Sequence, residues 1–159
     1  MTKGYQYKGS GLDYVYLVNG YKVHETRHGK GVSITDADGL HHTIAAAIVT
    51  GSHPICGQEV RFLRSMLGIS QSALACIMNV ERGQVTRWEK DPHKPLPGTA
   101  DVALRLFSAL NLAGNATAKK LVERLKECDE GEYKKNLEAK KTSKMSFKET
   151  SSGWLREAA

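Results

Sequence analysis

The residues best suited to chemistry lie between Gly57 and Lys90, and that chemistry is recognition of nucleic acid. One short stretch, 82–90, reads RGQVTRWEK and carries donors with no evident packing role. Arg matches the O6 and N7 acceptors of guanine, and Gln matches N6 and N7 of adenine. The predicted base-reading set is Arg82, Gly83, Gln84, Thr86 and Arg87.

Two short helices must position this set. Ser70 precedes a helix whose first free N–H groups its hydroxyl can cap. The buried stripe of that helix is predicted to be Leu74, Ala75 and Met78. Asn79 then takes the turn, because Asn tolerates the left-handed conformation. Val85 and Trp88, three residues apart, are predicted to anchor the next helix in the core and leave the base-reading set outside.

This pattern resembles the Xre/Cro-type helix-turn-helix family of phage and bacterial regulators. That family shows a Ser-Gln start, Leu-Ala, a tight turn and then Val-Ser/Thr-x-Trp-Glu, and the similarity covers roughly Gly57 to Leu110. It implies that Arg82, Gly83 and Gln84 read bases, with Arg87 one turn further on. The predicted phosphate-binding set is Ser70, Gln71, Lys90 and Lys94.

The same family often pairs an Arg late in its first helix with the Glu after the Trp-type residue. The resemblance therefore implies a partly buried pair between Arg64 and Glu89, which would support the site. Two positions depart from the family pattern. Glu81 replaces the usual Ser or Thr cap, and Gly83 removes a side chain that normally reads a base, so base reading should rest on Arg82, Gln84 and Arg87.

The composition is that of a soluble globular protein, and its mild positive charge fits a DNA binder but does not establish nucleic-acid binding without the motif. Of 159 residues 40% are hydrophobic and 25% charged, and the net charge is +6. No apolar run approaches the roughly 18 residues of a membrane span, and the first residues lack a secretion signal, so we expect a cytoplasmic protein with no membrane partner. Cys56, Cys76 and Cys128 are widely spaced, which favours free thiols over disulfides or zinc.

The first fifty residues have a strand-like period. Residues 14–18 and 21–26 predict a hairpin around Asn19-Gly20, because Asn-Gly supplies positive φ angles. The remaining predicted elements are a third strand at 31–35, a turn at 36–39, a helix at 40–50 and a linker at 51–54. This half resembles the companion domain of some antitoxin-like bacterial regulators, but the zinc cysteines of that domain are missing. The resemblance therefore implies neither a metal nor another cofactor.

The histidines offer an alternative that we weigh and set aside. His24 and His28 could join His41 and His42 in a zinc site or a hydrolase. Along a strand, however, residues 24 and 28 would lie roughly 13 Å apart, too far for one ion. Catalysis also needs a nucleophile or paired carboxylates near a base, and Asp36 and Asp38 flank a turn where Asp is common for backbone reasons, so we predict that the protein is not an enzyme.

Beyond the motif, three prolines in 91–97 end the helix, and residues 100–111 predict another. Residues 117–128 predict a further helix with a narrow apolar stripe suited to a dimer seam. The Lys-rich residues 129–159 are predicted to be a flexible tail.

The expected fold class is α+β: a small N-terminal hairpin or three-stranded sheet with one helix, then an all-α five-helix helix-turn-helix bundle. The expected domains are 1–53, 54–128 with a dimerising C-terminal helix, and the tail 129–159. The predicted function is a dimeric repressor that binds an inverted-repeat operator in double-stranded DNA. The alternative is an antitoxin that binds a toxin through its N-terminal domain or its Lys-rich tail and represses the shared operon; the N-terminal domain could also bind another regulator.

Overall fold

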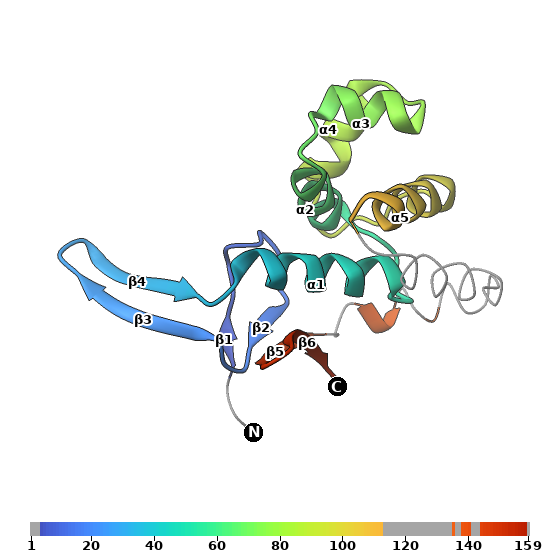
Figure 1. The fold of residues 1–159 in the computed structure, drawn as a ribbon. Coiled ribbons are helices and arrows are strands. Elements are labelled where there is room, and N and C mark those ends of the chain that lie inside the picture. The colour runs from blue at the N-terminus through green and yellow to red at the C-terminus, as the bar shows by residue number, and fades with distance from the viewer. Residues whose placement is uncertain (1–3, 113–134, 136–137, 141–143, 159) are drawn as a thin grey trace. The chain divides into compact units, whose positions relative to one another are not determined.

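Strands occupy both ends of the chain and helices the middle (Figure 1). The computed structural model describes residues 4–112, 135, 138–140 and 144–158. It divides into two compact units, with the boundary inside the first helix. We call residues 1–44 with 144–159 the sheet unit, and residues 45–143 the helical unit.

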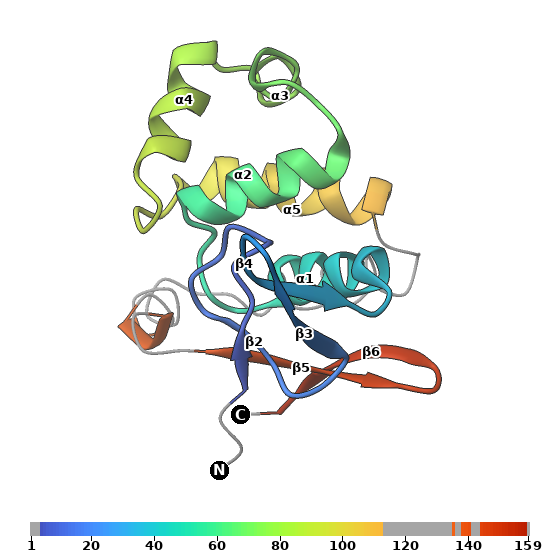
Figure 2. The same cartoon turned by 90° about the vertical axis from the view of Figure 1, so that its left-hand side faces the viewer.

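The sheet unit is built on a mixed sheet whose strands come from both ends of the chain (Figure 2). Its strand order is β1 (Tyr5–Gln6), β2 (Val15–Leu17), β5 (Met145–Thr150), β6 (Gly153–Glu157). The central pair β2–β5 is parallel and the two outer pairs are antiparallel.

The predicted fold class, a small N-terminal sheet followed by an all-helical bundle, is therefore wrong. The fold is mixed α/β, with strands at the two ends of the chain and the helices between them. The prediction is wrong at the C-terminal end, because the Lys-rich composition of 129–159 is typical of a flexible tail. Residues 144–158 instead supply β5 and β6 to the same sheet as β1 and β2.

Burial explains why these C-terminal strands form. Met145 and Phe147 alternate with polar residues along β5 and are buried, and Trp154 of β6 is buried as well. The Trp154 indole N–H donates to the carbonyls of Thr35 and Asp36, at 3.0 and 3.2 Å. A side chain on Gly20 would lie 2.6 Å from the Trp154 ring, so glycine is needed there for space as well as for its positive φ.

The second sheet corrects another expectation. The hairpin predicted around Asn19-Gly20 is wrong, because β2 pairs with β1 and β5 instead of β3. Of the two turn residues only Gly20 has a positive φ, whereas a tight primed turn needs both. Asn19 instead exchanges hydrogen bonds with the backbone of Glu149. The actual hairpin joins β3 (Tyr21–Thr26) to β4 (Gly29–Ile34).

The first helix, α1 (Ala37–Thr50), begins earlier than predicted. The expected turn at 36–39 contributes only Asp36, which has a positive φ and accepts a hydrogen bond from the Gly39 N–H at 3.1 Å. This is the capping role that Asp fills at helix starts. Leu40 and Ile44 of α1 are fully buried.

The helical unit continues with α2 (Gly57–Leu67), α3 (Gln71–Met78), α4 (Arg82–Lys90) and α5 (Gly98–Leu112). Fully buried residues from all four helices form its core: Val60, Leu63, Leu74, Val85 and Leu104. The predicted helix at 117–128, with Cys128, lies outside the described residues. In the described part of the chain, each helix is too short or too polar to cross a lipid bilayer.

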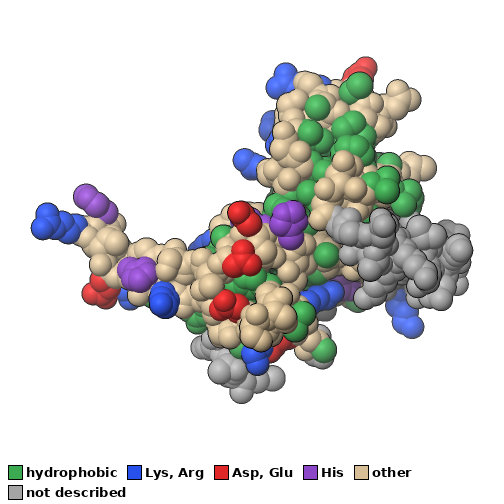
Figure 3. Space-filling model, in the orientation of Figure 1, with side chains coloured by type: hydrophobic (Ala, Val, Ile, Leu, Met, Phe, Trp, Pro, Cys, Tyr) green, Lys and Arg blue, Asp and Glu red, His purple; other side chains and the backbone are tan. Residues whose placement is uncertain are grey.

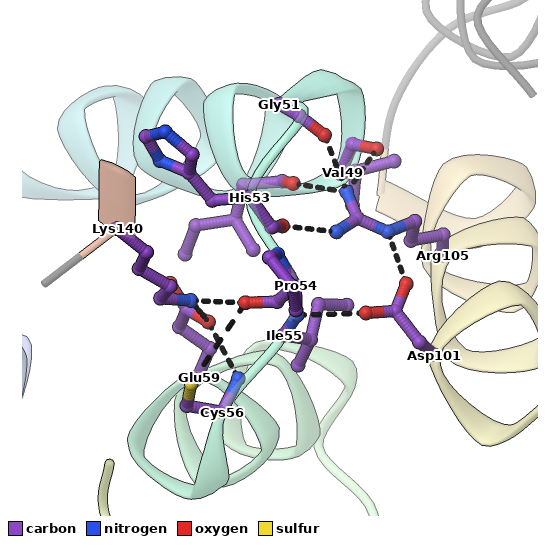
Figure 4. A network of polar contacts seen from close by, with 11 residues as sticks. Val49, Gly51, His53, Pro54, Ile55, Cys56, Glu59, Asp101, Arg105 and Lys140 are labelled. Atoms are coloured by element: carbon purple, nitrogen blue, oxygen red, sulfur yellow. Dashed lines mark hydrogen bonds and ion pairs between the residues drawn. The ribbon is translucent and has the colours of Figure 1, made fainter. Parts of the chain in front are cut away.

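A buried arginine on α5 makes hydrogen bonds that hold the linker between α1 and α2, residues 51–56, in place (Figure 4). Arg105 is only 1% exposed and pairs with Asp101 one turn earlier. Its guanidinium donates to the carbonyls of Ile48, Val49, Gly51 and His53. These groups include C-terminal carbonyls of α1, which have no partner within the helix. Asp101 in turn accepts from the Ile55 N–H at 2.7 Å, so one ion pair orders the whole linker.

A second buried charge lies at the start of α2. Glu59 accepts a hydrogen bond from the N–H of Cys56 at 2.8 Å, which satisfies the helix N-terminus. The ammonium of Lys140 pairs with Glu59 at 2.5 Å and also donates to the Pro54 carbonyl (Figure 4). Burial raises the pKa of the Cys56 thiol, which favours its neutral form.

The C-terminal strands should be essential to stability. Replacing Phe147 by Ala would leave a cavity among fully buried residues and should destabilise the protein by about 3–5 kcal/mol. Leu155→Ala, on the next strand but 56% exposed, should change stability by less than about 0.5 kcal/mol. Urea unfolding measures both, and equal small effects would show that residues 144–158 are not part of the core.

The hydrogen bonds from Arg105 to the linker lead to a separate prediction about stability. Arg105→Ala leaves Asp101 buried without its partner and several linker carbonyls unpaired, so stability should fall by about 3–5 kcal/mol. Arg105→Lys should recover only part of this loss, because an ammonium lacks the planar fork of a guanidinium. Arg156→Ala, at an exposed position, is the control in thermal unfolding. An Arg105→Ala variant as stable as the control would contradict the role of Arg105 in ordering the linker.

Candidate nucleic-acid interface

The pair of helices that should carry the site is joined by a tight turn. The hydroxyl of Ser70 caps α3 by accepting from the Ala73 N–H at 3.0 Å. Asn79 ends α3 in the left-handed conformation, with φ 53° and ψ 47°. Only Val80 and Glu81 separate Asn79 from α4, so the chain reverses at the residue that the sequence indicated.

Two apolar residues hold α4 against the rest of the helical unit. Val85 is fully buried and Trp88 is 8% exposed, as the sequence predicted for both. Gly57, the first residue of α2, lies directly against the backbone of α4 at Trp88. A Cβ on Gly57 would lie 2.0 Å from the carbonyl oxygen of Trp88, so only glycine lets the backbones of α2 and α4 approach this closely.

A bidentate ion pair fixes α4 to α2. Arg64 donates from Nε and Nη2 to the two carboxylate oxygens of Glu89, at 2.6 and 3.0 Å. Both side chains are largely buried, with 18% of Arg64 and 6% of Glu89 exposed. Burial by itself raises the pKa of Glu89, but hydrogen bonds from Arg64 and Gln71 and the charges of Arg64 and Arg61 outweigh burial. The pKa of Glu89 therefore lies below its usual value, and the residue is ionised at neutral pH.

Gln71 and Thr86, predicted to contact DNA, are half-buried and hydrogen-bonded to each other. The amide N–H of Gln71 donates to Glu89 at 3.0 Å, and its carbonyl accepts from the Thr86 hydroxyl at 3.2 Å. This network brings α3 into the Arg64–Glu89 pair. The structure thus gives both residues a role in positioning α4, and the second N–H of the Gln71 amide can still donate to a phosphate.

The remaining base-reading candidates share the outer face of α4. Arg82, Gly83 and Arg87 are exposed and Gln84 is half-buried. Gln84 accepts a hydrogen bond from Arg87 at 2.7 Å, so it orients the guanidinium along the helix. Around a Cβ on Gly83 the nearest atom would be Arg87 Nη1, at 3.8 Å, so the fold does not require glycine there. Figure 3 shows Lys and Arg side chains spaced along the side of the helical unit that α4 forms.

Two open clefts border this face, and they bring in residues that sequence analysis missed. One, of about 690 Å³, runs from the turn before α4 past Gln84 and Arg87 to Thr99 and Ala100 at the start of α5. The other, of about 400 Å³, places Lys94 near the same two side chains. No local pattern in the sequence places Thr99 beside Arg87, because the packing of α5 on the rest of the helical unit brings them to the same cleft.

The other predicted phosphate ligands are at the edges of the site. Lys90 ends α4 and Lys94 lies in the loop after it, and both are exposed. Ser70 is exposed, but its hydroxyl already caps α3. Glu81 occupies the position before α4 without making a side-chain capping bond. Cys76 and Ile77 on α3 are exposed, and Cys76 and Cys56 are free thiols.

The histidines do not converge in the described residues. His24 contacts Ser33 at 2.9 Å on the β3–β4 hairpin, whereas His41 contacts the Tyr7 hydroxyl at 2.8 Å. Burial lowers the pKa of His41, Asp38 opposes this shift and His42 adds to it, so the imidazole is neutral at pH 7. Within the described ranges, no cluster of three or more His, Cys, Asp or Glu side chains could hold a metal ion.

Comparison of the chain with protein-family models, with curated proteins and with solved structures found no match.

The pH dependence of stability tests the ion pair. Glu89 has a lowered folded-state pKa, so its stabilisation is complete above the unfolded value of about 4.3 and disappears as the pH falls through the folded value. At pH 7, Glu89→Gln should cost about 2 kcal/mol in urea unfolding, because charge-assisted hydrogen bonds are lost. The difference from the unmodified protein should shrink toward pH 3. Glu157→Gln, an exposed control, should change little, and a pH-independent cost for Glu89→Gln would contradict the pair's role.

Proposed function

We propose that the protein binds double-stranded DNA sequence-specifically through α4 and acts as a transcription regulator of the helix-turn-helix type. The observation that carries this proposal is the division of α4 into two faces. Val85, Trp88 and Glu89 fix one face to α2 and α3, while Arg82, Gln84 and Arg87 remain on the other. A rigid helix with outward guanidinium and amide groups suits the acceptors and donors of a major groove.

Two further features support major-groove binding over a solvated helix face. Gly83 leaves backbone uncovered between Arg82 and Gln84, which would let a base pair approach α4 closely. The hydrogen bond from Arg87 to Gln84 orders a long side chain before binding. Less conformational entropy is then lost when the guanidinium meets a guanine.

We further propose that two copies act together as a repressor in the cytoplasm and bind an inverted repeat with recognition helices roughly 34 Å apart. The surface of α5 supports a dimer. Val102, Leu106 and Leu110 recur one helical turn apart and are 37%, 39% and 77% exposed. A second copy would cover this apolar stripe.

Selection of bound duplexes from a random library tests the proposal. The expected result is a consensus with two-fold symmetry, because two identical recognition helices would read related half-sites. Failure to enrich any sequence, at low salt and with folded protein, would rule out sequence-specific DNA binding.

Substitution on α4 should then separate specific from non-specific binding. Arg87→Ala should weaken binding to the selected duplex by about 10- to 100-fold and relax the preference at one base pair, since a bidentate contact contributes about 1–3 kcal/mol. Binding to mixed-sequence duplex should change much less. Arg156→Ala removes an equal charge from the sheet unit and should leave the base preference intact. Fluorescence anisotropy measures both affinities, and equal losses on both duplexes would defeat base reading by Arg87.

A further inference from the structure

The β3–β4 hairpin projects from the four-stranded sheet of its own unit (Figure 1). We call residues 21–34 the arm. Its six cross-strand pairs run from Tyr21↔Ile34 to Thr26↔Gly29. β3 is exposed along all but its first residue, and β4 is at most half-buried. A two-stranded ribbon this exposed buries little of its own surface, so the fold alone does not account for its length.

Among the described residues, the contacts that anchor the arm to the sheet unit lie at its base. The ring of Tyr21 stacks on Tyr5 with a centroid distance of 4.9 Å, and the Thr35 N–H donates to the Gly20 carbonyl at 2.9 Å. Beyond this base, Val23 is 52% exposed. The outer part of the arm is therefore available to a partner.

The two faces of the arm differ in chemistry. Paired residues share a face, so Lys22 and His24 lie beside Ser33, Gly31 and Gly29. On this face one strand carries long polar side chains and the other is nearly bare backbone. The opposite face carries apolar pairs at the base and Glu25 opposite Lys30 nearer the tip.

Gly31 is not required by the arm's own structure. A Cβ there would meet only Thr26 Cγ2 at 3.7 Å and the His24 carbonyl oxygen at 4.0 Å, which are ordinary contacts. Gly29 differs, because its φ of 120° in the turn favours glycine. A glycine inside a strand with no internal need for one is typical of a site where another molecule approaches the backbone closely.

The charge of the arm indicates what that molecule is. The arm carries Lys22, Arg27 and Lys30 against a single acid, Glu25, and it also carries His24 and His28. Figure 3 shows these side-chain types distributed along the ribbon. Backbone N–H groups along the unpaired strand edges can also donate hydrogen bonds to phosphate oxygens.

From these observations we infer that the arm is a second DNA contact, with its Lys22–His24–Gly31 face lying against the sugar-phosphate backbone of a duplex. A strand of six residues spans about 20 Å, enough to follow several phosphates. Bare backbone opposite the basic side chains lets the ribbon approach this surface. The inference rests on the proposed DNA-binding function and adds to it a contact that contributes affinity without reading sequence.

The salt dependence of binding tests the arm. Lys22→Ser and Arg27→Ser are combined in one variant of the full chain, and Lys30, which lies on the opposite face beside Glu25, is left unchanged. The matched control combines Lys8→Ser and Arg156→Ser, which removes the same charge from exposed positions elsewhere in the sheet unit. Binding to mixed-sequence duplex is followed by anisotropy from about 50 to 200 mM salt.

The arm variant should bind at least about tenfold more weakly at low salt, and its slope of log affinity against log salt should become shallower by about 2. The control should keep the slope of the unmodified protein. Equal slopes for the two variants would overturn the arm contact. If Arg87→Ala still impaired specific binding in that case, the proposed function would stand. Absence of any duplex binding by the unmodified protein would overturn both.

Gly31→Val provides an independent variant that leaves the charge unchanged. Valine favours strands, so circular dichroism and thermal unfolding should match those of the unmodified protein. The added side chain should hold the backbone away from phosphates and reduce affinity about tenfold, as for the loss of one or two phosphate contacts. A folded Gly31→Val protein with undiminished affinity would show that nothing approaches this face closely.

Discussion

The bidentate pair between Arg64 and Glu89 is the interaction on which the candidate site depends. It joins the end of α2 to the end of α4, and Gln71 extends it to α3. A short helix such as α4 has little stability of its own in water, so its position must come from tertiary contacts. Val85 and Trp88 supply the apolar part of those contacts, and the ion pair fixes the helix by directional bonds. The outward face of α4 is therefore held in place before any ligand binds.

Buried charges recur at the points where chain segments meet. Arg105 satisfies carbonyls at the end of α1, and Glu59 satisfies the start of α2 while pairing with Lys140. Burying such pairs costs desolvation, and an apolar replacement could match their stability. These pairs add directional hydrogen bonds, because a guanidinium can donate to several carbonyls at once in only one conformation of the linker. In this chain the polar interactions order the segments that apolar packing alone would leave variable.

The parts of the structure that the sequence predicted are those decided by near neighbours. The Ser70 cap, the turn at Asn79 and the burial of Val85 and Trp88 all follow from residues within a few positions of each other. The α3–α4 pair could therefore be located without a structure. The register between β2 and β5 could not, because it joins residues more than a hundred positions apart through short apolar patterns interrupted by lysines.

Side-chain partners were equally hard to predict. The sequence predicts a phosphate contact for Gln71, but only the structure shows that Gln71 is hydrogen-bonded to Glu89 and Thr86. Similarly, Asn19-Gly20 has turn-forming residues, yet Asn19 binds the distant backbone of Glu149. At Asn19 a partner remote in sequence overrides the local turn propensity, whereas the predicted phosphate contact of Gln71 stays a prediction. Thr99 borders the cleft beside Arg87, and only the position of α5 in the structure identifies it as a candidate site residue.

The central claim is that the outer face of α4 meets the bases of a DNA duplex. Backbone amide chemical shifts, recorded while a selected duplex is titrated into the full chain, test it most directly. The account predicts that the largest changes fall on Arg82 to Arg87, with small changes at buried Leu63 and Leu104. Saturable binding that leaves the amides of Arg82 to Arg87 unperturbed would contradict it.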